Sequence, residues 1–193
     1  MIITISGTPG SGKSTVAKLL VEKISAERIY VGGIRRALAR KKGMSLEQLN
    51  EYAQTHPETD IDVDQKAAAE ARLLEKQGKI VVVEGRTQFH FLPKSVKIYI
   101  KVDPVVGAQR IWKDLHSAAT RQERNEGNLR SLEETKQRTR EREEEDARRY
   151  KKYYGIDHRD ESQYDLVLDS TRQSAEEIAE KIVVFVQKKK NNF

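Results

Sequence analysis

The sequence predicts an α/β fold in three layers, with helices on both faces of a five-stranded parallel sheet. Short apolar runs alternate with helical patterns along the chain, as in proteins built from β–α–β units. The run at residues 80–83 is continuously β-branched, which is typical of a parallel strand buried on both faces. A length of 193 residues suits one domain with inserted lobes.

A glycine-rich loop joins the first expected strand, residues 2–5, to the first expected helix. It has the pattern G-x-x-x-x-G-K-[ST] and consists of Gly7, Thr8, Pro9, Gly10, Ser11, Gly12, Lys13 and Ser14, followed by Thr15. The glycines let backbone N–H groups converge on a phosphate, and the helix adds the positive end of its dipole. Lys13 can reach the β- and γ-phosphates of a nucleotide, and the Ser14 hydroxyl can bind Mg²⁺. The motif alone does not separate kinases from GTPases, ATPases or sulfotransferases.

The composition narrows the class of partner. The formal net charge is +6, which fits nucleic acid, an anionic membrane or small phosphates, and the loop favours small phosphates. The absence of cysteine excludes disulfides and thiolate chemistry. There is no basic leader before the loop and no apolar run of membrane-spanning length. We therefore expect a cytoplasmic protein that binds neither membrane nor nucleic acid.

A helical insert follows the second expected strand, residues 28–31. That strand ends at Gly32 and Gly33. Two adjacent glycines indicate that the backbone closely approaches a ligand or the first loop. The alternative is an ordinary turn. Helical patterns cover residues 34–42 and 60–77, and a capping box at Ser45 predicts another helix between them. The helical insert thus runs from residue 34 to residue 77, between two strands.

Charged residues follow the third expected strand, residues 80–83. Glu84 and Arg86 come directly after it, where open α/β sheets bind their ligands. The alternative is that the two side chains form an ion pair with each other at the surface.

The remaining strands are expected at residues 96–102 and 164–168. Asp103 and Pro104 predict the start of the helix after the fourth strand, and Arg110 lies on its polar side. A capping box at Ser174 begins the last helix.

Residues 116–152 are dominated by charged side chains. Their second part predicts a helix over residues 131–154 with Ser131 as N-cap. This helix is either an ordinary solvated helix or part of a mobile lid. The polar stretch at residues 120–128, which contains Gly127, is the expected flexible tip.

These pieces together resemble the cytidylate kinases, and most of all the short archaeal-type branch of the P-loop nucleoside monophosphate kinases. The matching pieces span nearly the whole chain: the phosphate loop, Gly32 with Arg36, residues 43–47 with Tyr52 and Ala53, and residues 56–58, 83–86, 148–157 and 164–167. The combination is far more specific than the phosphate loop alone.

The resemblance implies one P-loop NTPase-type kinase domain over residues 1–193, expected as a monomer. Its core would comprise residues 1–33, 79–116 and 155–193, with an NMP-binding lobe at 34–78 and a lid at 117–154. It implies ATP with Mg²⁺ as the donor and CMP or dCMP as the acceptor.

The resemblance also assigns residues to the site. The catalytic residues would be Lys13, Arg142 and Arg149. The acceptor would be bound by Gly32, Arg36, Glu84, Arg86 and Asp146. Arg110 and the loop of Ser170, Thr171 and Arg172 are candidates for the ATP side. Arg142, Asp146 and Arg149 fall at i, i+4 and i+7, on one face of a helix.

The chain departs from the family at three places. Tyr30 stands where a serine is usual, residues 87–90 differ from the usual ones, and the lid is longer than in the short branch. The Tyr30 ring either packs into the core beneath Gly32 and Gly33, which we favour, or lines the pocket and stacks on the base.

Three functions are therefore compared. The first is a CMP/dCMP kinase, and the second is a kinase for another acceptor such as UMP, AMP or a non-nucleotide. The third is a nucleotide-gated nucleic-acid-binding protein, which the interleaving of basic and acidic residues does not favour.

Overall fold

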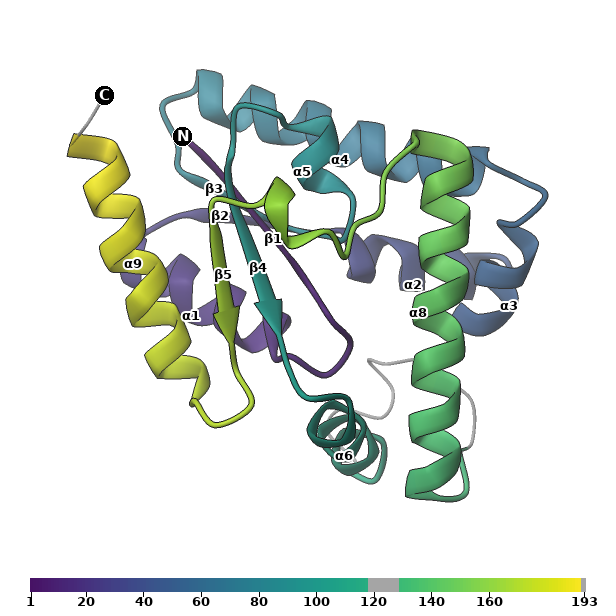
Figure 1. Ribbon diagram of the computed structural model, residues 1–193. Coiled ribbons are helices and arrows are strands. Elements are labelled where there is room, and N and C mark those ends of the chain that lie inside the picture. Colours follow the sequence, from purple (N-terminus) through teal and green to yellow (C-terminus); the bar gives the residue numbers. More distant parts are fainter. Residues whose placement is uncertain (118–128, 192–193) are drawn as a thin grey trace.

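Five parallel strands form the centre of the molecule (Figure 1), and the computed structural model describes residues 1–117 and 129–191. The strand order is β2-β3-β1-β4-β5. The strands are β1 (Ile2–Gly7), β2 (Glu27–Tyr30), β3 (Val81–Glu84), β4 (Val96–Lys101) and β5 (Leu166–Asp169). The predicted α/β fold class and its five strands are confirmed.

The central strand explains where the phosphate loop lies. All six residues of β1 are buried, and the strand pairs with β3 on one side and β4 on the other. Because every strand is parallel, the loop after β1 lies at the same edge of the sheet as Glu84, the last residue of β3, and Arg86, which follows it.

Two apolar cores lie on opposite faces of the sheet. Helices α1 (Lys13–Ile24) and α9 (Ala175–Asn191) cover one face (Figure 1) and share a core with the strands. Helix α4 (Glu58–Lys76) covers the other face, where its alanines pack on β1, β2 and β3. These are the three layers that the sequence predicted.

The remaining helices stand at the carboxyl edge of the sheet or connect its strands. They are α2 (Val31–Lys41), α3 (Leu46–Tyr52), α5 (Gln88–Phe91), α6 (Pro104–Leu115), α8 (Leu132–Tyr154) and the 3₁₀ turn η1 (Glu161–Gln163). In Figure 1, α8 stands upright beside α3. Among the described residues, no helix combines the length and apolarity needed to cross a membrane.

Side-chain capping agrees with the sequence at four helix starts. The side chains of Ser45, Asp103, Ser131 and Ser174 each accept a hydrogen bond from a backbone N–H in the first turn of the helix that follows. These bonds satisfy donors that have no acceptor within the helix.

One local expectation was wrong, one short helix was not predicted, and one expectation lies outside the described residues. Gly32 and Gly33 belong to the first turn of α2, so they do not end a strand. The short helix α5 was not predicted, because its four residues are too few to show a period. The expected tip at residues 120–128 falls on residues that the structure does not describe.

Close backbone contacts require glycine within the phosphate loop. Gly7 has φ +143°, and a Cβ there would lie 2.7 Å from the carbonyl carbon of Ile100 in β4. Gly10 has φ +74°, and a Cβ there would lie 2.6 Å from the Cα of Gly107 in α6. The loop is therefore fixed by backbone packing against two elements of the core.

We expect Gly7→Ala to destabilise the protein by at least about 3 kcal/mol, because backbone of a core strand must move to accommodate the methyl group. Gly12→Ala is the matched control: Gly12 also has positive φ, but a Cβ there meets no atom within 4 Å. Its loss should be about 1–2 kcal/mol. Urea unfolding followed by circular dichroism measures both, and equal losses would contradict the proposed packing constraint.

Candidate active site

A cleft of about 720 Å³ lies at the carboxyl edge of the sheet. It is bounded by the phosphate loop, α2, the end of β3, α6 and α8. Nine lysines and arginines and five carboxylates are among the described residues that line it. Its volume is in the range of small-molecule sites, and the excess of cations suits a ligand that carries several negative charges.

The structure brings most of the predicted site residues together around this cleft. Thirteen of them line it: Pro9, Gly10, Gly12, Lys13, Ser14, Thr15, Gly32, Arg36, Glu84, Arg86, Arg110, Arg142 and Asp146. Gly7, Thr8, Ser11 and Arg149 do not line it. The first three are residues of the phosphate loop itself, and Arg149 is a buried residue of α8.

Lys13 is folded back onto its own loop. Its Nζ donates hydrogen bonds to the carbonyl oxygens of Gly7 at 2.9 Å and Thr8 at 2.6 Å. Burial of the ammonium and then the nearby Arg86 guanidinium lower the pKa of Lys13 to about 7. The charge on Lys13 is therefore sensitive to pH near neutrality and to an anion bound beside it.

The side-chain oxygens of Ser14, in the phosphate loop, and Glu84, at the end of β3, lie next to each other. The Ser14 Oγ donates to Glu84 Oε1 at 2.5 Å, and Arg28 Nη2 donates to Glu84 Oε2 at 2.5 Å. A hydroxyl and a carboxylate suit Mg²⁺, which binds few protein oxygens and keeps water or phosphate in its other positions. No cluster of three or more carboxylates or imidazoles that could hold a metal occurs among the described residues.

Glu84 and Arg86 do not pair with each other. Glu84 is buried and bonds to Arg28, whereas Arg86 forms an ion pair with Asp146 of α8. The alternative interpretation as a mutual surface ion pair was therefore wrong.

The predicted ATP-side residues meet at the other flank of the phosphate loop. Arg110 donates from Nη2 to the Ser170 carbonyl oxygen at 2.8 Å and from Nη1 to the Ser170 Oγ at 3.2 Å. The Ser170 Oγ in turn donates to the carbonyl oxygen of Ser11 at 3.0 Å. The loop after β5 is thus bonded to the phosphate loop, while Arg172 is exposed.

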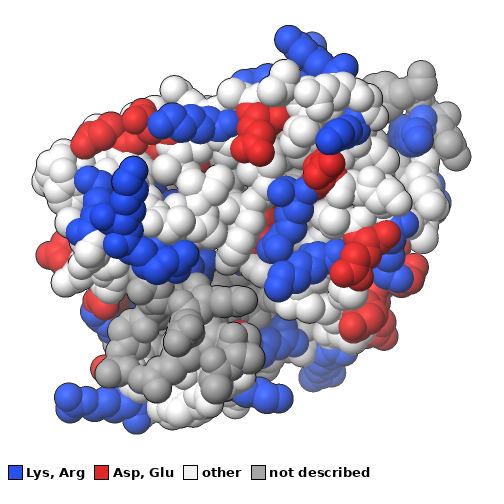
Figure 2. Space-filling view, turned by 180° about the vertical axis from the view of Figure 1, so that it is seen from behind, with Lys and Arg blue, Asp and Glu red and all other residues white. Residues whose placement is uncertain are grey.

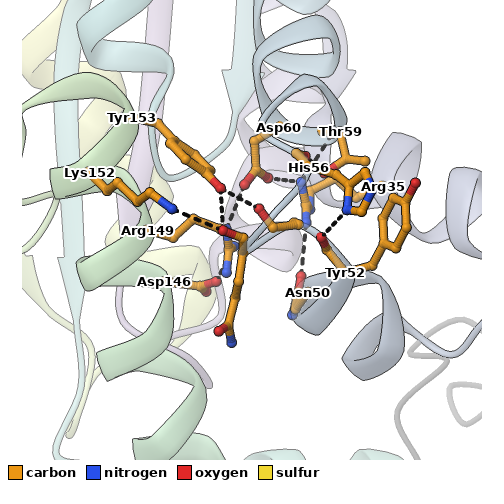
Figure 3. Close-up of polar contacts among 12 residues, drawn as sticks. Arg35, Asn50, Tyr52, His56, Thr59, Asp60, Asp146, Arg149, Lys152 and Tyr153 are labelled. Atoms are coloured by element: carbon orange, nitrogen blue, oxygen red, sulfur yellow. Dashed lines mark hydrogen bonds and ion pairs between the residues drawn. The ribbon is translucent and has the colours of Figure 1, made fainter.

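A buried network of arginines and aspartates connects α8 to the rest of the site (Figure 3). Arg149 donates from Nε to Asp60 Oδ2 and from Nη2 to Asp146 Oδ1, both at 2.5 Å. Asp146 also pairs with Arg86, and Asp60 also pairs with Arg35. Each carboxylate therefore bridges at least two guanidinium groups, and the network joins α2, α4, α8 and the loop after β3, which carries Arg86.

The network changes the interpretation of Arg149. Its side chain is 2% exposed and is bonded to two carboxylates, so in this structure it is a buried residue that holds Asp146. Arg142, on the same helix, does line the cleft, with its Nε 4.0 Å from Asp146 Oδ2. A direct contact between Arg149 and phosphate remains a prediction. The bonds of Arg149 to Asp60 and Asp146 do not support it.

Several residues that line the cleft were not identified as site residues from the sequence, among them Arg28, Arg35, Asp60 and Asp64. Asp64 is buried and accepts hydrogen bonds from Gln88 and Tyr154 at 2.9 Å, and burial raises its pKa. The available signal was the pair of aspartates four residues apart in an alanine-rich helix, which places two carboxylates on one face.

The position of Tyr30 differs from the favoured expectation. Its ring packs on Gly32 and Gly33, as expected, but it is half-buried and lines the cleft instead of entering the core. Its hydroxyl accepts a hydrogen bond from Arg36 Nη1 at 2.7 Å.

Comparisons with known proteins cover nearly the whole chain. A model of the AAA domain family matches residues 3–130. A protein named cytidylate kinase from Archaeoglobus fulgidus is 41% identical over 191 residues, which is 98% of this chain and 97% of that protein. Another of that name, from Methanothrix thermoacetophila, is 40% identical over 89% of this chain and 90% of its own length. The solved structure of a shikimate kinase from Bacteroides thetaiotaomicron is 12% identical, with a TM-score of 0.60 over 97% of this chain and 98% of its own, which shows a shared fold.

We expect binding of a nucleoside triphosphate to take up a proton through Lys13. Phosphate oxygens stabilise the charged amine, so its pKa rises from about 7, and affinity should fall as pH rises above that value. At pH 8 the uptake should approach about one proton per site. Calorimetric titration in two buffers of different ionisation enthalpy measures it. Lys13→Arg is the control, since arginine is always charged; the same uptake in this variant would contradict the assignment.

Proposed function

Because the chain belongs to the cytidylate kinase family, we propose that it transfers the γ-phosphoryl group of ATP to CMP or dCMP. The observation that supports this most is one cleft in which Lys13 and Ser14 of the phosphate loop face Arg36, Arg86 and Arg142. The loop can hold a donor, and the arginines can hold the phosphate of an acceptor opposite it.

The donor side would be held by the backbone and by one lysine. The first N–H groups of α1 have no acceptor within the helix and are available to phosphate oxygens. Lys13 would leave the carbonyl oxygens of its own loop and bind the β- and γ-phosphates, where its charge balances the charge that develops during transfer. Ser14 and Glu84 would hold Mg²⁺, which neutralises phosphate charge when it is bound.

The acceptor side would be held by arginines whose positions are fixed by carboxylates. Phosphoryl transfer needs in-line positioning and distributed positive charge rather than covalent help from the protein. Arg36, Arg86 and Arg142 can grip phosphate oxygens with planar forks. Asp146 keeps Arg86 in place, and Arg149 keeps Asp146 in place.

We propose the domain division that the resemblance implied: a core of residues 1–33, 79–116 and 155–193, an NMP-binding lobe at 34–78 and a lid at 117–154. Several contacts support joint movement of the lobe with α8. Arg138 pairs with Glu47 of α3. Tyr153 and Lys152 donate to the carbonyl oxygens at the end of α3, at 2.7 Å from Tyr153 Oη to Ala53 O and 3.2 Å from Lys152 Nζ to Gln54 O.

The two other functions receive less support. Among residues 1–117 and 129–191, no contact favours UMP, AMP or a non-nucleotide over CMP. For a nucleic-acid-binding protein one expects a continuous basic stripe. Figure 2 shows blue Lys and Arg side chains and red Asp and Glu side chains interspersed on the face that it presents.

We predict that kcat/KM for CMP and dCMP exceeds that for UMP and AMP by at least about tenfold, because mismatched polar groups in a closed site are costly. A coupled assay of ADP release with each monophosphate measures this.

Lys13→Ala, a change on the surface of the cleft, should remain folded and lose at least about a thousandfold in kcat. Preference for UMP or AMP would contradict the acceptor alone, whereas normal turnover by folded Lys13→Ala would contradict the kinase mechanism.

We predict that binding both substrates slows hydrogen exchange in the lid. A two-substrate mimic should protect the amides of residues 129–145, because Arg142 in this part of the chain lines the cleft and would contact bound phosphate. Residues 146–154 are already tied to α3 and α4 and should change little. Exchange measured by mass spectrometry with and without the mimic tests this, and unchanged exchange at 129–145 would argue against a lid.

A further inference from the structure

Tyr30 lies in the middle of a continuous chain of contacts that crosses the cleft. On one side its Oη accepts a hydrogen bond from Arg36 Nη1 at 2.7 Å. On the other, the Arg28 guanidinium lies over its ring, 4.7 Å from the centroid. Arg28 bonds to Glu84, and Glu84 accepts from Ser14. The chain therefore runs from an arginine of α2 to the serine of the phosphate loop.

The two glycines after Tyr30 make room for its ring. A Cβ at Gly33 would lie 2.6 Å from the ring atom Cδ1, and a Cβ at Gly32 would lie 2.9 Å from Cε2. Both glycines have ordinary helical conformations, so backbone strain does not explain them. Glycine is a poor helix former. At these two positions it is needed because any larger side chain would collide with the Tyr30 ring.

The ring is also needed by Arg28. The Nε of Arg28 is buried and makes no hydrogen bond to the described residues, so its guanidinium is held by Glu84 at one end and by the face of Tyr30. A cation over an aromatic face is attracted to it, more strongly when both are partly desolvated. Removal of the ring would leave Arg28 free to move, and Glu84 with it.

We propose that Tyr30 is a positioning residue with two separable actions. Its hydroxyl orients Arg36 towards the phosphate of the acceptor, and its ring, through Arg28, holds Glu84 beside Ser14 at the expected Mg²⁺ position. A serine at this position is too short to reach Arg36 in the same way and offers no face to Arg28. The inference rests on the proposed function for the identity of the acceptor, but its contacts are independent of which base is used.

The hydroxyl is tested by Tyr30→Phe, which keeps the ring. KM for the best acceptor should rise about tenfold, with KM for ATP and the Mg²⁺ dependence unchanged. The double variant Tyr30→Phe/Arg36→Lys should be no worse than Arg36→Lys alone, because the hydroxyl acts through Arg36. Effects that multiply, or an unchanged acceptor KM, would overturn this part.

The ring is tested by Tyr30→Leu and by Gly33→Ala. Tyr30→Leu should raise the Mg²⁺ concentration needed for half-maximal activity by about fivefold, an effect that Tyr30→Phe lacks. Gly33→Ala displaces the ring and should raise the acceptor KM, although alanine favours the helix. An unchanged Mg²⁺ requirement in Tyr30→Leu would overturn the action through Arg28.

Tyr164→Phe is the matched control. The Tyr164 hydroxyl also makes a hydrogen bond of 2.7 Å, to the carbonyl oxygen of His158, but Tyr164 does not line the cleft. This variant should have a lower Tm and an unchanged acceptor KM. If it raised the acceptor KM as much as Tyr30→Phe, the effect would be general loosening, and the positioning role would be wrong.

Failure of the proposed function gives a different result from failure of this inference. A wild type that transfers phosphate to another monophosphate is assayed with that acceptor, and the same changes are expected. A wild type that transfers to none overturns the proposed function. In that case, calorimetric titration of ATP with and without Mg²⁺ still compares wild type with Tyr30→Leu. Equal enhancement of binding by Mg²⁺ in both would overturn the inference separately.

Discussion

The site depends on two buried carboxylates, Asp60 and Asp146, each of which bridges two arginines. Both side chains are 2% exposed. Removing an ion from water costs several kcal/mol, and only close, multiple pairing repays it. The pairs here meet that condition, because Asp146 contacts both Arg86 and Arg149. Without these carboxylates, the guanidinium groups at this end of the cleft would repel one another and lose their fixed directions.

The same charge balance explains why the cleft is poised for an anion. Cationic groups outnumber carboxylates along its walls. Burial lowers the pKa of both Lys13 and Arg86, and a neighbouring arginine lowers each of them further. A bound phosphate would reduce this repulsion, which favours the binding of an anion. Such fixed cations can stabilise developing negative charge without having to reorganise first.

The sequence predicted those features that local pattern determines. The five strands, the phosphate loop and the capping residues are encoded in short windows, by apolar runs, glycine spacing and serine or aspartate before a helix. The network of Asp60, Asp146 and Arg149 was not predicted as a network, because its members are far apart in the chain and no periodicity relates them. Gly32 was expected at the end of a strand but lies in α2. Glycine is required there because of the Tyr30 ring, a contact that exists only in the folded chain.

The bonds that fasten the end of α8 to α3 limit how this fold can be recombined. Tyr153 and Lys152 donate to the carbonyl oxygens of Ala53 and Gln54, the two residues that follow α3. A chimera carrying residues 34–78 of a distant kinase would keep these donors of α8, and wherever the grafted backbone followed another path the donors would lose their acceptors. Residues 34–78 and α8 should therefore be exchanged together if either is to be replaced.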